Sequence, residues 1–149
     1  MRVSEARDRY FAENGFSTAA YTERWAKLKL GPIPLAFPNT RSRQAAIALH
    51  DLHHLATGYA TTPVGEAEIG AWELGGGCGP YPAAWVLNAI AALIGLAISP
   101  RRIVRAFRAG RRSTNLYQRG WSDDLLDLEL AELRTRLGVD RESKRSVQT

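Results

Sequence analysis

The feature that most constrains the fold is a series of helix start and stop signals along the chain. Thr62-Pro63 and Ser99-Pro100 each place a hydroxyl side chain directly before a proline, a combination that favours the beginning of a helix. Gly58 and Gly138 follow segments with helical spacing of apolar residues, where glycine favours the end of a helix. No run of alternating apolar and polar residues is long enough to force a sheet. The chain is therefore predicted to be all-α.

The chain of 149 residues has the length of one domain and can bury a core without disulfides or a metal. We expect a single compact helical domain over residues 1–149, with about six or seven helices and a loose polar tail at 140–149. Loops rich in glycine and proline are predicted at residues 31–34 and 75–82. The helices are expected at residues 4–13, 18–29, 41–57, 63–74, 83–98, 100–109 and 122–137.

Cysteine usage and the N-terminal sequence point to the cytoplasm. The single cysteine, Cys78, excludes a disulfide framework and a metal site built from several cysteines. The first residues contain no apolar signal segment, and Glu5, Asp8 and Glu13 are atypical of a transit peptide. We therefore expect a reducing, cytoplasmic compartment.

Charged residues are distributed unevenly along the chain. Residues 44–100 contain no Lys or Arg, four carboxylates and all three histidines, whereas residues 101–121 contain seven arginines and no acid. The net charge of +5 suits an anionic membrane surface or a phosphorylated ligand. Nucleic acid is not expected as a partner, because no nucleic-acid-binding motif accompanies the arginines. The arginines form either a solvated face or a site for a lipid headgroup or prenyl phosphate, and the chemistry is expected in the cation-free middle.

The most apolar segment is residues 83–98. It is shorter than the ~20 residues that span a bilayer, and Asn88 interrupts it. Two interpretations remain open. The segment is either a central buried helix, or a helix that contacts lipid or lines an apolar ligand channel, since Arg101 and Arg102 follow directly.

A candidate metal site lies in the segment HDLHH, which begins at His50. On a helix with about 100° per residue, His54 lies about 40° and Asp51 about 100° from His50, so the three side chains share one arc. Two imidazoles one turn apart can bind one divalent ion, and Glu66 in the next helix can supply a further carboxylate. Nitrogen and oxygen ligands suit Zn²⁺ first, and also Fe²⁺ or Mn²⁺. We predict His50, Asp51, His54 and Glu66 as the site.

Other residues near this motif allow more than one interpretation. His53 lies outside the arc and is either solvated or hydrogen-bonded behind the ligands, and the same alternatives apply to Glu73. The glycine run at 75–79 lacks the Gly-Lys-Ser/Thr ending of a phosphate-binding loop. Cys78 has no fixed histidine partner that would make it a nucleophile. A phosphohydrolase of the His-Asp type is not expected, because no histidine precedes His50.

The motif HDxxH, followed after eleven residues by Glu, resembles the signature of the ubiquinone (coenzyme Q) biosynthesis protein four family. The sequence HDLHHLATGYATTPVGE matches that signature at His50, Asp51, His54 and Glu66. The two flanking glycines in this stretch, the arginine-rich segment ending in GRR, and LAELRTRLGV near the C-terminus are also similar. The resemblance covers roughly residues 40–139, about two thirds of the chain.

This resemblance implies a helical metal protein in which the four matched residues are both catalytic and metal-binding. It implies peripheral association with the inner face of a membrane and action on a polyprenylated quinone precursor, through metal-assisted, oxidative decarboxylation at ring carbon C1. The implied partners are prenyl lipids, other enzymes of quinone biosynthesis and a second copy in a homodimer. The alternative function is a non-catalytic one, in which the protein binds lipid or quinone intermediates or organises biosynthetic enzymes as a scaffold.

Overall fold

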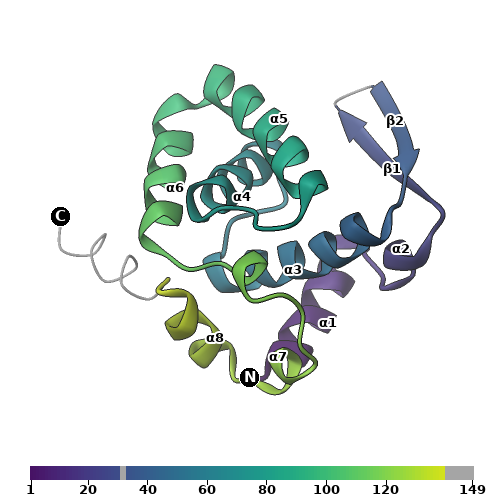
Figure 1. The fold of residues 1–149 in the computed structure, drawn as a ribbon, viewed down its shortest axis with the longest axis vertical. Coiled ribbons are helices and arrows are strands. Elements are labelled where there is room, and N and C mark those ends of the chain that lie inside the picture. Colours follow the sequence, from purple (N-terminus) through teal and green to yellow (C-terminus); the bar gives the residue numbers. More distant parts are fainter. Residues whose placement is uncertain (31–32, 140–149) are drawn as a thin grey trace.

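The helix signals of the sequence are present in the computed structural model, which describes residues 1–30 and 33–139 (Figure 1). Thr62 accepts a hydrogen bond from the backbone N–H of Gly65, with Pro63 in the first turn, and Gly138 ends the last helix at a φ of 74°. The elements are α1 (Val3–Asn14), α2 (Ala19–Thr22), β1 (Trp25–Leu30), β2 (Ile33–Pro38), α3 (Arg41–Thr57), α4 (Pro63–Gly76), α5 (Pro82–Ile98), α6 (Pro100–Arg112), the 3-10 turn η1 (Leu116–Gln118), α7 (Asp124–Asp127) and α8 (Leu130–Leu137).

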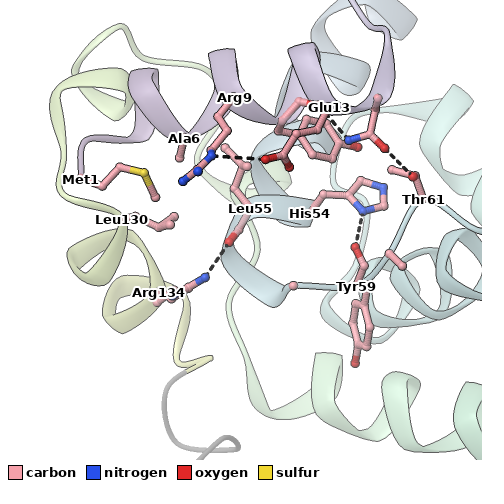
Figure 2. A pocket seen from close by; sticks show the side chains of 14 residues that line it. Met1, Ala6, Arg9, Glu13, His54, Leu55, Tyr59, Thr61, Leu130 and Arg134 are labelled. Atoms are coloured by element: carbon pink, nitrogen blue, oxygen red, sulfur yellow. Dashed lines mark hydrogen bonds and ion pairs between the residues drawn. The ribbon is translucent and has the colours of Figure 1, made fainter.

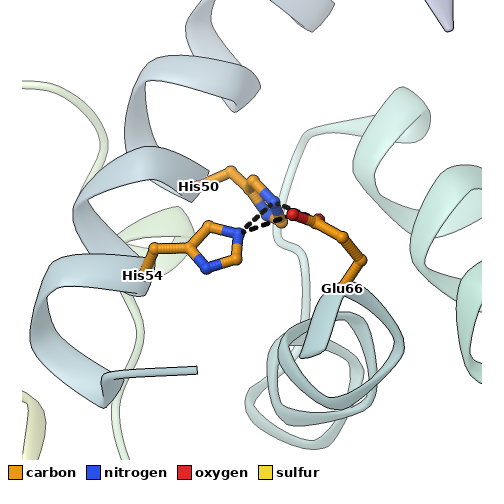
Figure 3. Close-up of side chains that lie close together, drawn as sticks. All are labelled: His50, His54 and Glu66. Atoms are coloured by element: carbon orange, nitrogen blue, oxygen red, sulfur yellow. Dashed lines mark hydrogen bonds and ion pairs between the residues drawn. The ribbon is translucent and has the colours of Figure 1, made fainter. Parts of the chain in front are cut away.

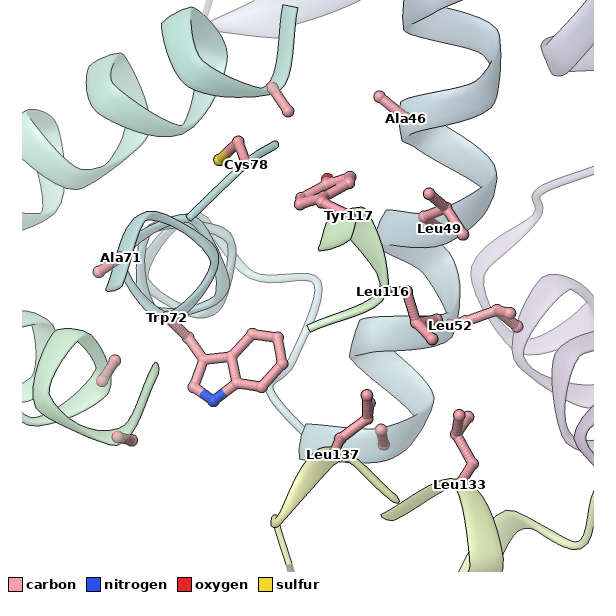
Figure 4. Close-up of a cluster of buried hydrophobic side chains, with 14 of the residues drawn as sticks. Ala46, Leu49, Leu52, Ala71, Trp72, Cys78, Leu116, Tyr117, Leu133 and Leu137 are labelled. Carbon is pink, nitrogen blue, oxygen red and sulfur yellow. The ribbon is translucent and has the colours of Figure 1, made fainter. Parts of the chain in front are cut away.

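Helices α3 and α4 lie at the centre of the fold. α5 and α6 pack against α4, while α1, α2, α8 and η1 pack against α3 (Figure 1). Between α3 and α8, Leu49 and Leu52 contribute to a core that also contains Leu116 and Leu133 (Figure 4). Over residues 1–30 and 33–139, six helices have eight residues or more, which confirms the predicted all-α single domain.

The helices around α4 approach its backbone closely because small residues line the contacts. A Cβ atom on Gly110 of α6 would lie 1.9 Å from the backbone oxygen of Trp72 in α4. A Cβ atom on Gly95 of α5 would lie 2.5 Å from the Cβ of Ala67. Neither position has room for a larger side chain, so α5 and α6 hold α4 at short range.

The predicted helix at residues 18–29 is wrong. Only the single turn α2 is helical there, and β1 then pairs antiparallel with β2, from Trp25 opposite Pro38 to Leu30 opposite Ile33. The alternation in WAKLKL is short, but a hairpin partner close in sequence gives each residue a cross-strand neighbour that the isolated segment lacks. Of the predicted loop at 31–34, residues 33–34 belong to β2, and residues 31–32 lie outside the described residues.

The predicted helix at residues 122–137 is interrupted. α7 ends at Asp127, and Leu128 and Glu129 are extended before α8 begins. The extended segment pairs with the N-terminus, because the N–H of Val3 donates to the carbonyl of Leu128 over 2.8 Å. The backbone of this segment thus forms hydrogen bonds to another part of the chain in place of helical ones. The predicted tail at 140–149 lies outside the described residues.

The most apolar helix, α5, is not the central helix that one interpretation predicted. Its buried positions hold small or polar residues such as Ala84, Asn88 and Gly95, while large ones such as Leu93 are exposed. In the described part of the chain, none of the helices combines the length and apolar composition that a bilayer crossing requires. The second interpretation, contact with lipid or a ligand channel, stays a prediction.

The close contact between α4 and α6 leads to a stability prediction. Gly110→Ala should lower the free energy of unfolding by about 1–3 kcal/mol, because the added methyl group would overlap the backbone oxygen of Trp72. The exposed neighbour Arg111 provides the matched control, and Arg111→Ala should change stability by less than about 0.5 kcal/mol. Urea unfolding of both variants measures the difference. Equal stabilities of Gly110→Ala and the wild type would contradict the close contact between α4 and α6.

Candidate metal centre

Two neighbouring helices bring three of the four predicted site residues together. His50 and His54 lie one turn apart on α3, and Glu66 lies in the first turn of α4 (Figure 3). The Nε2 atoms of the two histidines are 3.2 Å apart. Glu66 Oε2 lies 3.4 Å from His50 Nε2, and Glu66 Oε1 lies 3.3 Å from His54 Nε2. One ligand atom from each residue lies within 4.8 Å of the others, a spacing that a single divalent ion can bridge.

The other ring nitrogen of each histidine fixes the direction of its Nε2 atom. His54 Nδ1 donates to the backbone carbonyl of Tyr59 over 2.9 Å, and His50 Nδ1 donates to Glu73 Oε1 over 2.8 Å. An oxygen acceptor at Nδ1 holds a proton there, so the two Nε2 atoms face each other and Glu66, and each offers a lone pair when its ring is neutral. Metal-binding histidines have this arrangement, with an outer acceptor at the nitrogen that does not bind the ion.

The charges around the cluster favour a cation. Burial lowers the pKa of His50, but Glu73 and Glu66 outweigh burial and raise it well above its usual value. Burial raises the pKa of Glu66, but hydrogen bonds and charges of His50 and His54 outweigh it and lower the pKa to about 2. Without a metal, His50 therefore carries a second proton on Nε2, the atom that faces His54 and Glu66. The same negative surroundings would attract a divalent ion in its place.

Glu73 lies behind the cluster and is completely buried, so the interpretation of this residue as solvated is wrong. One carboxylate oxygen accepts from His50 and His53, over 2.8 and 2.6 Å. The other accepts from Asn88 Nδ2 over 2.5 Å and from the hydroxyl of Tyr117 over 2.9 Å. Burial raises the pKa of Glu73, but His50 and His53 outweigh burial and hold it well below its usual value. Glu73 thus stays ionised and orients His50.

His53 is also fully buried, which excludes solvation and leaves the alternative of a hydrogen-bonded residue behind the ligands. Its Nδ1 donates to Glu73, and its Nε2 accepts from the backbone N–H of Leu116 over 2.9 Å. Both ring nitrogens are therefore occupied, and His53 connects α3 with α4 and η1. The helical wheel placed His53 outside the arc of ligands, and the structure agrees.

Asp51 does not join the three converging residues. It is buried and accepts a short hydrogen bond from the hydroxyl of Tyr21, a residue of α2 that sequence reasoning did not single out. Burial raises the pKa of Asp51, and the hydrogen bond from Tyr21 opposes this shift. Asp51 still lines the same cavity as His50, His54 and Glu66. Its role as a fourth ligand stays a prediction.

The cluster opens on a cavity of about 360 Å³. Its other walls are largely aromatic, with Tyr10, Phe11, Phe16 and Tyr21, and they include the buried residue Arg43. A second, more open cavity of about 400 Å³ lies on the other side of His54, between α1, α8 and the segment from Tyr59 to Thr61 (Figure 2). His54 and Tyr10 line both cavities, with their rings stacked at 5.7 Å.

No known protein family matches the chain, and neither a curated protein nor a solved structure is significantly similar to it. The resemblance to the ubiquinone biosynthesis family therefore stays a prediction from the motif and its sequence context. Independently of any family, the structure brings His50, His54 and Glu66 together.

The buried carboxylate of Glu73 leads to a second prediction. Glu73→Gln should lower metal affinity by about 10–100-fold, because the amide cannot accept all four hydrogen bonds and His50 loses its fixed orientation. It should also destabilise the protein by about 1–3 kcal/mol, because at least one buried donor loses its acceptor. Isothermal titration with Zn²⁺ and urea unfolding measure the two effects.

The matched control is Glu68→Gln on the same helix. Glu68 is also buried, although less completely than Glu73, and it binds Arg102 on α6, away from the cluster, so its variant should keep wild-type metal affinity. The pH dependence gives a further check. Because folding lowers the pKa of Glu73, its contribution to stability is present above pH 4.5, the ordinary pKa, and is lost as the pH falls. A Glu73→Gln variant whose stability falls as steeply below pH 4.5 as that of the wild type would contradict this.

Proposed function

We propose that the chain binds one divalent metal ion between His50, His54 and Glu66, with Zn²⁺ as the first candidate and Fe²⁺ or Mn²⁺ as alternatives. This proposal rests on the convergence of the Nε2 atoms of His50 and His54 with the carboxylate of Glu66. The Nδ1 atoms of both histidines donate to oxygen acceptors outside the cluster. Two imidazoles and one carboxylate form a donor set typical of catalytic zinc, which keeps a further coordination position for water or substrate. The adjacent cavity offers room on that side.

The bound ion would supply a Lewis acid that polarises a carboxylate or phenolate oxygen of the substrate. The protein's own residues would bind and orient that substrate. Tyr10, Phe11 and Phe16 offer aromatic walls to a planar ring, and Arg43 lines the same cavity and supplies a positive charge for an acid. A cavity of about 360 Å³ lies within the size range of small-molecule sites. These features favour an aromatic acid as ligand.

From the sequence resemblance we propose a polyprenylated quinone precursor as the substrate, and oxidative decarboxylation at ring carbon C1 as the reaction. The bond between the ring and its carboxyl group breaks and CO₂ leaves. One atom of O₂ enters the ring as a hydroxyl group, and the other leaves as water with two protons and two electrons from a hydroquinone-type reductant. A hydrolase or a simple lyase would need neither O₂ nor a reductant. A requirement for both in the activity assay therefore tests the proposed oxidative reaction.

The second candidate is a non-catalytic protein that binds quinone intermediates or organises other biosynthetic enzymes, with the ion fixing α3 to α4. The observation that favours it is the set of large apolar side chains exposed on α5, which suits a lipid or protein partner. We propose a cytoplasmic protein at the inner face of a membrane for either function. A second copy and other quinone-biosynthesis enzymes are its proposed protein partners.

The third prediction concerns metal content. Wild-type protein should retain about one divalent ion per chain after buffer exchange, because three converging ligands bind it tightly. His50→Ala and Glu66→Gln should each lose most of this metal. Elemental analysis of purified protein measures the stoichiometry. Glu23→Gln is the matched control, since Glu23 lines the same cavity outside the cluster. Full metal content in both site variants would contradict the site.

The fourth prediction separates the two functions at Asp51. Asn keeps an oxygen that can accept from Tyr21, so Asp51→Asn should leave the melting temperature close to that of the wild type. A catalytic site should lose turnover of a prenylated aromatic acid, measured as CO₂ release in the presence of O₂ and reductant. A lower melting temperature together with metal loss would favour the structural ion. Normal melting with full turnover would contradict a role for Asp51 in either function.

A further inference from the structure

On α5 the small and polar residues face the protein and the large apolar residues face outward, which is the reverse of the usual arrangement for a helix on a protein surface. The side that packs on α4 carries Ala84, Asn88, Ala92 and Gly95, and these are the buried residues of the helix. The outward side carries large apolar residues, which are Trp85, Val86, Ile90, Leu93, Ile94, Leu96 and Ile98, exposed by 38–67%. A contiguous apolar face of this kind on a domain surface is typical of an interaction site.

Helix α6 continues this face and adds positive charge beside it. Val104 and Phe107 are exposed by 40% and 43%. Arg102 pairs with Glu68, but five further arginines of α6 are exposed, namely Arg101, Arg105, Arg108, Arg111 and Arg112. None of these five has a carboxylate partner among the residues that the structure describes. The whole stretch of residues 74–122 contains seven arginines and no acid.

We propose that this α5–α6 face, formed by the outward apolar residues of α5, by Val104 and Phe107, and by the five exposed arginines, docks on an anionic lipid bilayer. The apolar side chains enter the boundary between headgroups and acyl chains, and the guanidinium groups bind lipid phosphates. This inference rests on the proposed association with a membrane and identifies the surface and the class of lipid. It does not depend on the metal site.

The geometry of α5 suits a helix that lies in the plane of the membrane surface. Seventeen residues give α5 a length of about 25 Å, and its buried side is held against α4 along that length. The outward side is free of charge, and Trp85 and the arginines of α6 are residue types enriched at membrane interfaces. In Figure 1, α5 and α6 flank α4 and meet at the turn between them, so the outward side of α5 and the exposed residues of α6 adjoin along this turn.

Charge favours lipid over a second copy of this chain. An isologous dimer through the α5–α6 face would bring the same arginine-rich surface from each subunit to one interface. Because residues 74–122 contain no carboxylate, neither copy could neutralise the arginines of the other there. Anionic phospholipids supply the missing negative charge, which adds to the burial of apolar area.

The test is co-flotation of the full-length, metal-loaded protein with vesicles. Phosphatidylcholine vesicles that contain phosphatidylglycerol at a mole fraction of ~0.3 are compared with pure phosphatidylcholine vesicles, at low and at high salt. Wild-type protein should bind the anionic vesicles about tenfold or more tightly, and salt should weaken this binding. Leu93→Gln/Ile98→Gln should lose binding to both vesicle types. Arg105→Gln/Arg108→Gln should lose the preference for anionic vesicles.

The matched control is Trp121→Gln, which changes an exposed apolar side chain just before α7, outside the α5–α6 face. It should bind vesicles as the wild type does.

Wild-type binding by both α5–α6 variants would overturn the assignment of this face, while the proposed membrane association would stand. A wild type that floats with neither vesicle would overturn both. A dimer that dissociates in the Leu93→Gln/Ile98→Gln variant, without vesicle binding by the wild type, would assign the face to a second copy. Metal content of the same samples tests the metal proposal separately.

Discussion

The buried carboxylate of Glu73 is the interaction on which the rest of the structure depends. A charge without exposure to water is costly unless donors surround it, and here the donors come from three other elements. His50 and His53 belong to α3, Asn88 to α5 and Tyr117 to η1. The charge therefore fixes the relative positions of four elements, because displacement of any one would leave a charged oxygen without a partner.

The same constraint orients the residues of the proposed metal centre. His50 can direct Nε2 toward His54 only while Nδ1 donates to Glu73, and the carbonyl of Tyr59 has the same effect on His54. Glu66 and Glu73 lie seven residues apart on α4, about two helical turns, so the residue that completes the cluster and the one that orients it share one rigid element. The proposed ligands are thus positioned by backbone packing before any ion binds, which lowers the entropy cost of binding.

The sequence predicted the features that depend on local interactions. Helix starts at Thr62 and Ser99, the spacing of His50 and His54, and the contribution of Glu66 all follow from neighbours within a few turns. For Glu73 the sequence left two alternatives open, solvated or hydrogen-bonded behind the ligands, because its partners lie fifteen to forty-four residues away and carry no local signal. The hairpin and the break at Leu128 were missed for the same reason, since each depends on backbone pairing with another segment.

The orientation of α5 shows why composition alone misplaced it. Its apolar content suggested a central helix, but burial depends on which side can approach a neighbour, and that is decided by the smallest residues. Gly95 allows contact with Ala67 of α4, and Gly70 of α4 allows close approach to Asn88. Only with this side inward can Asn88 reach Glu73, since a larger residue at either glycine would separate the helices. The large apolar side chains must then face outward, so the hydrogen bonding of one buried carboxylate and the exposed α5–α6 face follow from the same packing.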